Sequence, residues 1–198
     1  MEKNLEKRVE TLEKIVMGLV SKNVAKIKGN LGIGDSFELC GLKWTILEIS
    51  DNGYMCLADR LKESMVFDSS CNDWKPSKLR DYLNRDFYNM LCEAVGAENV
   101  VPFERDLISL DGQTDYGKCE DNVSLLTFDE YRRNRKNIQN TEDYWWWTVT
   151  PHSTDANNDT RWVAVVSSSG DFVSGSYSID YGVRPVCIFG SSIFESEE

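Results

Sequence analysis

The chain has 198 residues and a formal net charge of -11, and 41% of its residues are hydrophobic. This length suits one compact domain with an appendage, and the apolar fraction is sufficient for a sizeable core. The negative charge argues against nucleic-acid binding, which requires a basic stripe or patch, and against docking on anionic lipid. Nothing in the sequence resembles a signal peptide or a membrane-spanning run, so we expect synthesis in a cytoplasm and no membrane insertion.

The first predicted element is a helix over residues 2–28 with a narrow apolar seam. Leucine and valine each recur every seven residues in the 4–3 spacing of a coiled coil, and an asparagine occupies the last valine position. The seam consists of Leu5, Val9, Leu12, Val16, Leu19 and Asn23. We therefore predict a coiled-coil oligomerisation helix over residues 1–30, followed by one domain over residues 31–198. The alternative is an amphipathic helix that packs on its own domain.

The middle of the chain contains short strand patterns and two helix patterns. A glycine-rich hinge over residues 29–34 precedes the strand patterns. Ser77 is placed to cap the longer helix, and the Thr127 to Glu130 spacing is that of a capping box. The patterns predict strands over residues 36–39, 43–49 and 54–58, and helices over residues 77–95 and 125–135.

The last third of the chain is rich in strands and polar loops. A polar loop covers residues 152–160, and a turn over residues 167–171 separates two apolar runs, which predicts a hairpin. A final apolar strand is expected over residues 183–189. We expect this strand, Trp146 and Trp162 to form the rigid scaffold of the region.

The residues available for catalysis or metal binding are few. The only histidine, His152, lies in a polar loop, and the six cysteines are scattered with no Cys-x-x-Cys pair. Zinc binding and a cysteine–histidine nucleophile pair are therefore disfavoured. Asp155 and Asp159 offer oxygen ligands for calcium, but the loop lacks the spaced pattern of an EF-hand. We expect no catalytic residue, no metal and no cofactor, with the cysteines present as free thiols of a reducing compartment.

Four segments together resemble a bacterial and phage family of C-type-lectin-fold domains. They are residues 34–49, the Trp-x-x-Ser-x-Leu-Arg-x-Tyr-Leu-Asn run over 74–84 with its extension to 87, the Trp-Trp-Thr-Val-Thr-Pro run over 146–151, and Gly-Val-Arg-Pro-Val over 182–186. The family includes the variable proteins of diversity-generating retroelements, and it is related to the phage major tropism determinant and to formylglycine-generating-enzyme-like domains. One departure is Val149, where the family often has arginine.

The resemblance implies both a fold and a function. The fold is of the α+β class, a C-type lectin fold of short twisted antiparallel sheets with flanking helices, preceded here by the coiled-coil helix. The function is display of a binding surface for a protein or glycan ligand on a target cell, by a homo-oligomer in which a trimer is favoured over a dimer. The chain would then be a binding protein and not an enzyme, with a place in a virion tail as one location. The alternatives are a formylglycine-generating-type enzyme and a structural phage protein with no variable function.

The resemblance also implies a variable region over about residues 148–190. In such systems adenines of template codons are randomised, and Asn codons of the AAY type can never become codons for Lys, Glu, Gln, Met or Trp. From Thr148 to Phe194 the chain has no Lys, Glu, Gln or Met, and Trp162 is the only tryptophan. The alternative explanation is that a segment rich in strands and loops is poor in long helix-forming residues.

We place the expected recognition surface on the loop after Pro151 and on the segment from Asp171 to Tyr181. Tyr, Ser, Asn and Asp supply aromatic anchors and adaptable hydrogen bonds in such surfaces. We expect Phe172, Tyr177 and Tyr181 to dominate affinity while being dispensable for stability. The expected exposed binding residues are His152, Ser153, Asp155, Asn157, Asn158, Asp159, Phe172, Ser174, Ser176, Tyr177, Ser178, Asp180 and Tyr181.

Overall fold

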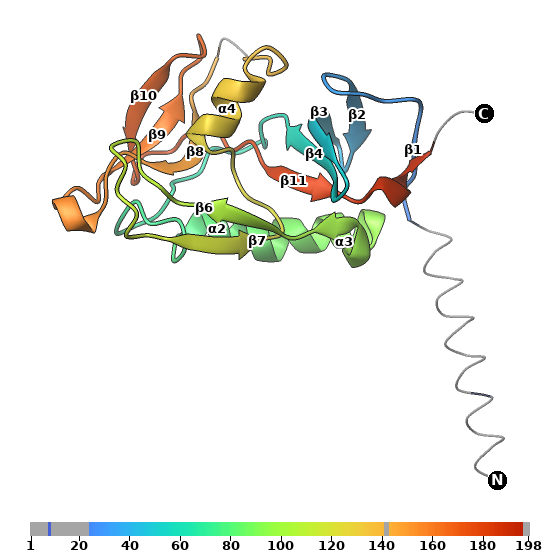
Figure 1. The fold of residues 1–198 in the computed structure, drawn as a ribbon, viewed down its shortest axis with the longest axis horizontal. Coiled ribbons are helices and arrows are strands. Elements are labelled where there is room, and N and C mark those ends of the chain that lie inside the picture. The colour runs from blue at the N-terminus through green and yellow to red at the C-terminus, as the bar shows by residue number, and fades with distance from the viewer. Residues whose placement is uncertain (1–7, 9–23, 141–142, 196–198) are drawn as a thin grey trace.

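The structure is a computed structural model, and it describes residue 8, residues 24–140 and residues 143–195. Two larger sheets lie side by side, and a helical run passes along one side of both (Figure 1). The run consists of α2 (Lys78–Tyr82), a π-helical turn (Leu83–Phe87) and α3 (Tyr88–Val95). Among the described residues, no helix is both long and apolar enough to cross a membrane.

The larger sheet has the strand order β2-β3-β4-β11-β5, and all of its neighbours are antiparallel. Its last strand in sequence, β11, is inserted between β4 and β5, so distant parts of the chain meet at its centre. The strands are β2 (Ser36–Leu39), β3 (Leu42–Ser50), β4 (Gly53–Ala58), β5 (Val100–Val101) and β11 (Val186–Phe189).

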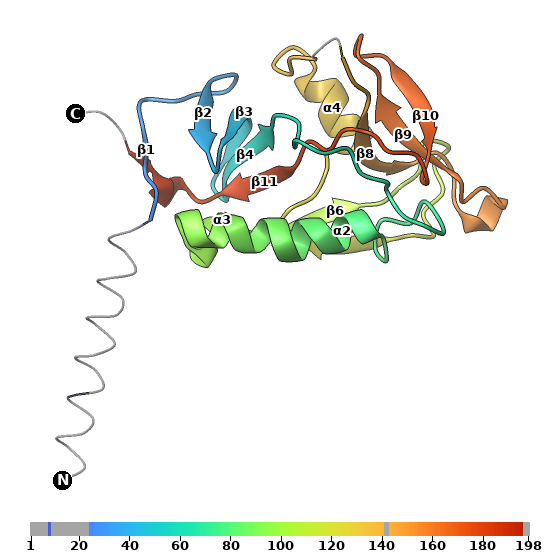
Figure 2. The same ribbon diagram turned by 180° about the vertical axis from the view of Figure 1, so that it is seen from behind.

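The second sheet has the order β10-β9-β8 and is also antiparallel. Its strands are β8 (Trp146–Pro151), β9 (Trp162–Val166) and β10 (Phe172–Ser176), and α4 (Phe128–Asn134) packs against one of its faces. Strands β6 (Phe103–Asp106) and β7 (Lys118–Asp121) form a separate hairpin, seen behind the helical run in Figure 2. The short strands β1 (Ile27–Lys28) and β12 (Phe194–Glu195) pair in parallel.

Two apolar clusters hold these layers together. The larger cluster joins both sheets to the helical run and contains Trp44, Trp74 and Trp147, all fully buried. The smaller cluster lies under α4 and contains Trp146 and Tyr131. The one-turn helices of the described chain are Ala97–Asn99, Asp155–Asn157 and Ser191–Ile193.

The predicted local elements are largely confirmed. The hairpin strands Trp162–Val166 and Phe172–Ser176 flank the expected turn. Ser77 caps α2 by accepting a hydrogen bond from the Arg80 N–H, and Thr127 and Glu130 form the capping box of α4. The last strand begins at Val186 and not at residue 183, because the preceding Pro185 has no N–H to donate and the Arg184 side chain is used as a cross-link.

The predicted fold class, an α+β C-type lectin fold preceded by a coiled-coil helix, is wrong. The described residues form a strand-rich molecule of several small sheets, and Ile27–Lys28, expected within the helix, is the strand β1. The motifs specify elements through local spacing, whereas the strand order depends on pairs far apart in sequence that the motifs do not contain. Most of the expected seam, including Leu5, Leu12 and Leu19, lies outside the described residues.

Candidate functional site

Side-chain hydrogen bonds from Asn72 and to Asp111 hold the loop over residues 152–160 against the domain. The Asn72 side chain donates to the carbonyl oxygens of Ser153 (3.0 Å) and Trp162 (2.8 Å), and its own oxygen accepts from the Tyr116 hydroxyl (2.7 Å). The Ser153 hydroxyl donates to Asp111 at 2.6 Å. Hydrogen bonds from Ser109 and Ser153 lower the pKa of Asp111. The loop is therefore a polar surface on a rigid base.

The structure places the expected binding residues at three levels of exposure. Ser153 and Ser176 were expected to be exposed and are buried: the first donates its hydroxyl to Asp111, and the second lies opposite Trp162 with its hydroxyl 3.1 Å from that of Ser178. Asp159, Phe172, Tyr177 and Tyr181 are half-buried. The exposed members are His152, Asp155, Asn157, Asn158, Ser174, Ser178 and Asp180.

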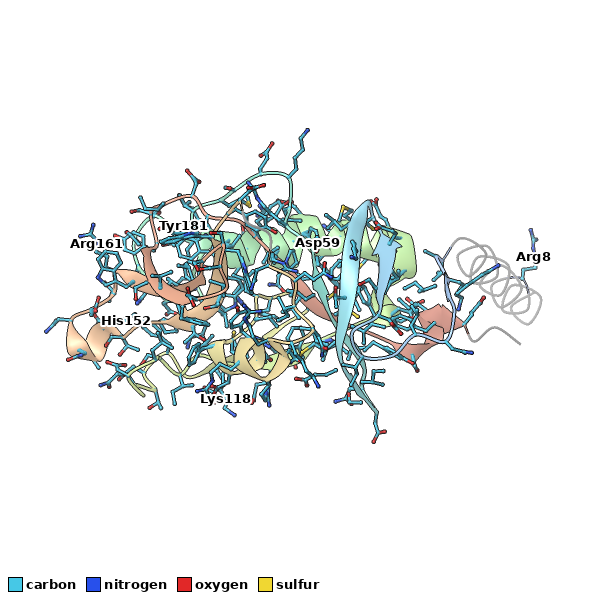
Figure 3. All side chains as sticks on the ribbon, turned by 90° about the horizontal axis from the view of Figure 1, so that it is seen from above. Arg8, Asp59, Lys118, His152, Arg161 and Tyr181 are labelled. Carbon is cyan, nitrogen blue, oxygen red and sulfur yellow. The ribbon has the colours of Figure 1, made fainter. Side chains whose placement is uncertain are left out.

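The loop and the end of β10 lie together, as expected. The His152 N–H donates to the Trp162 carbonyl, and the Tyr177 N–H donates to the Arg161 carbonyl, so both segments meet beside the start of β9. Figure 3 shows His152, Arg161 and Tyr181 at the same end of the molecule. The expected scaffold residue Trp162 is half-buried, with the Arg161 guanidinium 4.9 Å from its ring centre.

The Tyr181 ring lies against the backbone of β10. A Cβ atom added at Gly175 would come within 2.5 Å of Tyr181 Cε2, so only glycine leaves room for the ring. The ring meets Trp147 edge-on at 4.8 Å and stacks on Trp145 at 5.9 Å. Tyr181 is thus a link between the buried core and the surface.

Exposed apolar side chains lie on this ring, on the adjacent face of β10 and in the short segment that leads from β10 to Tyr181. Trp145, Val173 and Ile179 are 38%, 37% and 49% exposed, and Val173 shares the face of β10 on which Gly175 and Tyr181 meet. We call the four side chains Trp145, Val173, Ile179 and Tyr181 the β10 patch. Sequence analysis missed its first three members. The signal for one of them was present, because a strand that carries Phe172 and Val173 side by side is apolar on both faces.

Phe172 does not belong to this patch. Its ring meets Phe128 at 4.2 Å and Tyr131 at 5.4 Å, both edge-on, on the α4 side of the sheet. Neighbouring strand residues point to opposite faces, so Phe172 and Val173 cannot contact one ligand surface equally. Phe172 and Tyr181 therefore lie on opposite faces of β10, and the expectation that Phe172 dominates affinity together with Tyr177 and Tyr181 stays a prediction.

Several residues of the segments that carry the family resemblance bind other parts of the domain and stabilise the fold. Trp74 Nε1 and Arg80 Nε both donate to the Asp121 carboxylate, at 2.7 and 2.6 Å. The buried Arg184 donates to the carbonyl oxygens of Ala58 (3.1 Å) and Gln139 (3.0 Å). Burial lowers the pKa of Arg184. These contacts join separate sheets and loops.

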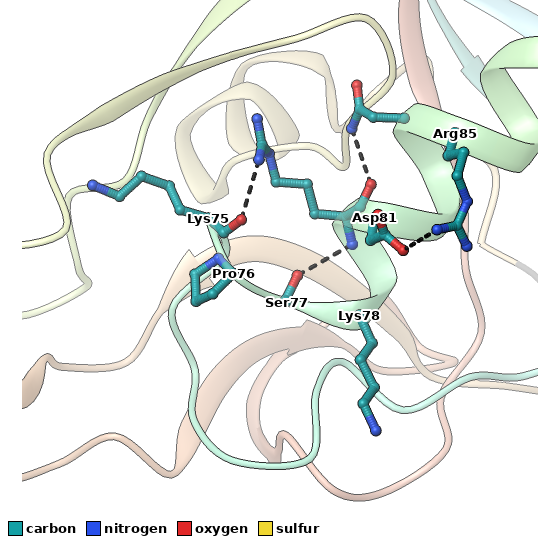
Figure 4. Close-up of a pocket in the computed structure, with 8 residues that line it drawn as sticks. Lys75, Pro76, Ser77, Lys78, Asp81 and Arg85 are labelled. Carbon is teal, nitrogen blue, oxygen red and sulfur yellow. Dashed lines mark hydrogen bonds and ion pairs between the residues drawn. The ribbon is translucent and has the colours of Figure 1, made fainter.

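A polar cavity of about 390 Å³ opens beside the start of α2 (Figure 4). Its two arginines are already engaged: Arg85 pairs with Asp81 at 3.0 Å, and Arg80 donates to the Lys75 carbonyl. In Figure 4 the Lys75 and Lys78 side chains extend in different directions. The arrangement is that of a helix start and offers no convergent group for a ligand.

The cysteines expected to matter for an enzyme are separated. Cys119 lies on β7 and Cys187 on β11, in different sheets, and burial raises the pKa of both thiols, that of Cys119 to about 11. All six cysteines are free. Within the described ranges, no group of three or more His, Cys, Asp or Glu side chains is placed to hold a metal ion. The expectations of no metal and no enzymatic activity stay predictions.

Residues 104–191 match the family model of a domain of unknown function (DUF6273). The match covers less than half of the chain, and it includes the 152–160 loop, β10 and the whole β10 patch. Neither the comparison with curated proteins nor that with solved structures gives a match.

Proposed function

We propose that this protein is a binding module that recognises a partner through the β10 patch and the adjoining 152–160 loop. The observation that carries the proposal is that Trp145 stacks on the Tyr181 ring, Val173 lies on the face of β10 that meets this ring, and the exposed Ile179 lies two residues before it in the chain. Exposed large apolar side chains that cluster beside polar groups are typical of interaction sites. The exposed Asp and Asn side chains of the loop supply the polar rim.

The physical properties of this surface suit recognition of a ligand on a cell. Aromatic side chains provide a large contact area at a small cost in conformational entropy, and the neighbouring Ser, Asn and Asp side chains provide adaptable hydrogen bonds. The β9–β10 hairpin and the fastened loop keep these groups in place before binding, which reduces the entropic cost of association. The ligand is a protein or glycan on a target cell.

The proposal includes diversification of the exposed positions. Ser174, Ser178 and Asp180 can change without disturbing the core, whereas Val163 and Val186 cannot, because both are fully buried. Sequencing many copies of the gene from its source population tests this part. Variation at the exposed positions together with constancy at the buried ones is expected. Variation spread equally over both sets would contradict it.

Binding itself is tested with a matched pair of charged substitutions. Ile179→Glu places a carboxylate in the β10 patch, and Ile49→Glu places one at a similarly exposed isoleucine of β3 in the other sheet. With fluorescently labelled protein on cells of the source community, we expect Ile179→Glu to weaken binding about tenfold or more. Ile49→Glu should leave binding within about twofold. Equal binding by the two variants would show that the patch is not the recognition surface.

A further inference from the structure

A second, apolar cavity of about 420 Å³ has no member of the β10 patch in its lining. It opens between the turn that joins β2 to β3, the loop that follows β4, and the α2–α3 helical run. The residues that line it include three with sulfur, Cys40, Met65 and Met90, and two aromatic ones, Tyr82 and Phe87. This volume lies in the range of cavities that hold small organic ligands.

The hairpin turn at the cavity holds its cysteine in an unfavourable backbone conformation. Cys40 and Gly41 both have positive φ, 54° and 71°, and form the two-residue loop between Leu39 and Leu42. Asn or Asp followed by Gly is the usual choice for such a turn. A cysteine here gains nothing for the backbone, but its thiol lies on the cavity wall, 3.9 Å from the Met90 carbonyl oxygen.

The helical run is also irregular at this place. The π-helical turn Leu83–Phe87 interrupts the run between α2 and α3. Tyr82, just before the turn, and Phe87, its last residue, both line the cavity. Single π-helical turns occur frequently at functional sites, where the extra residue re-aims side chains.

One wall of the cavity is held by the core of the domain. The Met65 N–H donates to the Tyr181 carbonyl at 2.9 Å, and the Met65 carbonyl accepts from Trp147 Nε1 at 2.8 Å. The segment that carries Met65 is thereby tied to the fully buried Trp147. A cavity with fixed walls is formed before a ligand arrives.

From these observations we propose that the cavity binds an uncharged aromatic compound of two or three rings. Sulfur atoms of methionine and cysteine make favourable contacts with the edges of aromatic rings, and the Tyr82 and Phe87 rings offer edge-to-face contacts. The charged residues in the lining, Lys62 and Glu63, are exposed to solvent, so we expect a charge on the bound compound to lack a buried partner.

The proposal is tested by titrating the full chain with N-phenyl-1-naphthylamine, an uncharged aromatic probe whose fluorescence rises in apolar surroundings. We expect saturable binding of one probe per chain and competition by indole. Met90→Glu, which puts a charge on the cavity wall, should weaken probe binding about tenfold or more. Asn89→Glu is the matched control, because it adds the same charge at the adjacent exposed helix position and should change binding by less than about twofold.

A second measurement on the unmodified chain does not depend on the folding of a variant. Saturating probe should slow alkylation of Cys40 by N-ethylmaleimide, while the rate at Cys71, a half-buried cysteine outside the cavity wall, stays unchanged. Absence of saturable binding would overturn the proposal. So would equal binding by the Met90→Glu and Asn89→Glu variants, or an unchanged Cys40 alkylation rate. Each of these results is independent of the proposed recognition by the β10 patch.

Discussion

At the scale of single residues, side chains that suggest function often hold the fold together. Asp121 shows this clearly, since its buried carboxylate accepts hydrogen bonds from both Trp74 and Arg80 and so ties the start of the helical run to β7. The same applies to Arg184, whose guanidinium donates to two backbone carbonyls, lies 3.5 Å from the Asp59 carboxylate and contacts the Trp146 ring. Because such buried side chains already have partners within the fold, the residues that contact a binding partner are expected among the exposed ones.

Tyr181 belongs to both groups, and its removal should affect both stability and binding. Its ring contacts Trp147 and Trp145 and lies over Gly175. We expect Tyr181→Ala to lower the free energy of unfolding by about 2 kcal/mol, because a large, partly buried ring is removed. This replaces the sequence-based expectation that the tyrosine is dispensable for stability. Ser174→Ala, at an exposed position of β10, should stay within about 0.5 kcal/mol.

Urea denaturation of the two variants beside the unchanged chain measures these differences. A Tyr181→Ala protein as stable as Ser174→Ala would mean that the ring contributes contact surface only. The patch would then be independent of the core, and its members could be exchanged freely.

At the scale of elements, the sequence predicts what its local spacing encodes. Thr127 and Glu130 are three residues apart, and that spacing alone produces the capping box found at α4. The hairpin follows from the turn residues between two apolar runs. The position of β11 between β4 and β5 could not be predicted in this way, since it pairs Cys187 with Cys56 across most of the chain.

The candidate site was predicted in part for the same reason. The loop and the end of β10 meet because β9 follows the loop directly and β10 returns beside it, which is a local consequence of the hairpin. The burial of Ser153 could not be predicted, because it depends on Asp111, which comes from another loop. The approach of Trp145 to Tyr181 is likewise a tertiary contact without a sequence signal.

The close contact between β10 and the Tyr181 ring predicts that any side chain at Gly175 will destabilise the fold. Gly175→Ala would bring a methyl group within 2.5 Å of Tyr181 Cε2 and 3.0 Å of Val165 Cγ1. We expect a loss of about 1–3 kcal/mol of stability, because the ring must move away from the strand. Tryptophan fluorescence should shift to longer wavelength as Trp145 loses its stacking partner.

Gly190→Ala is the matched control, since an added Cβ there meets its nearest atom at an ordinary 3.5 Å and the φ of Gly190 is −60°. Thermal unfolding followed by fluorescence compares the two. If both variants melt and emit like the unchanged chain, the ring is mobile on the strand and the patch lacks a fixed shape.

At the scale of the whole molecule, the described residues are held together by two apolar clusters and by ion pairs that have at least one buried partner. Arg105 on β6 and Glu130 on α4 form the most deeply buried pair, with Arg105 1% exposed and N–O distances of 2.8 and 2.6 Å. Arg105 also donates to the Leu125 carbonyl at 2.9 Å. The pair joins the β6–β7 hairpin to the helix that covers the three-stranded sheet. The expected oligomer stays a prediction that a mass measurement in solution would check.

This pair should make stability depend on pH in the acid range. Burial by itself would raise the pKa of Glu130, but the Arg105 guanidinium and the hydrogen bonds at Thr127 outweigh it and lower that pKa from its ordinary value of 4.5. A carboxyl group whose pKa is lowered by folding stabilises the folded state fully above its unfolded pKa. The contribution is lost as the pH falls through the lower, folded value. We therefore expect the free energy of unfolding to decline below about pH 4.5.

Glu130→Gln isolates this contribution. At pH 7 the variant should lose about 3–5 kcal/mol, because it leaves the Arg105 charge buried without its partner. In acid the difference between the two proteins should shrink, since the unchanged chain also loses the carboxylate charge. Glu104→Gln is the control: Glu104 pairs with Lys118 in an exposed position, so its loss should cost no more than about 1 kcal/mol. Urea unfolding at pH 7 and pH 3.5 measures the free energy of unfolding of the unchanged chain and of both variants. A constant gap between Glu130→Gln and the unchanged chain would show that Glu130 stabilises the fold by shape and hydrogen bonding and not by its charge.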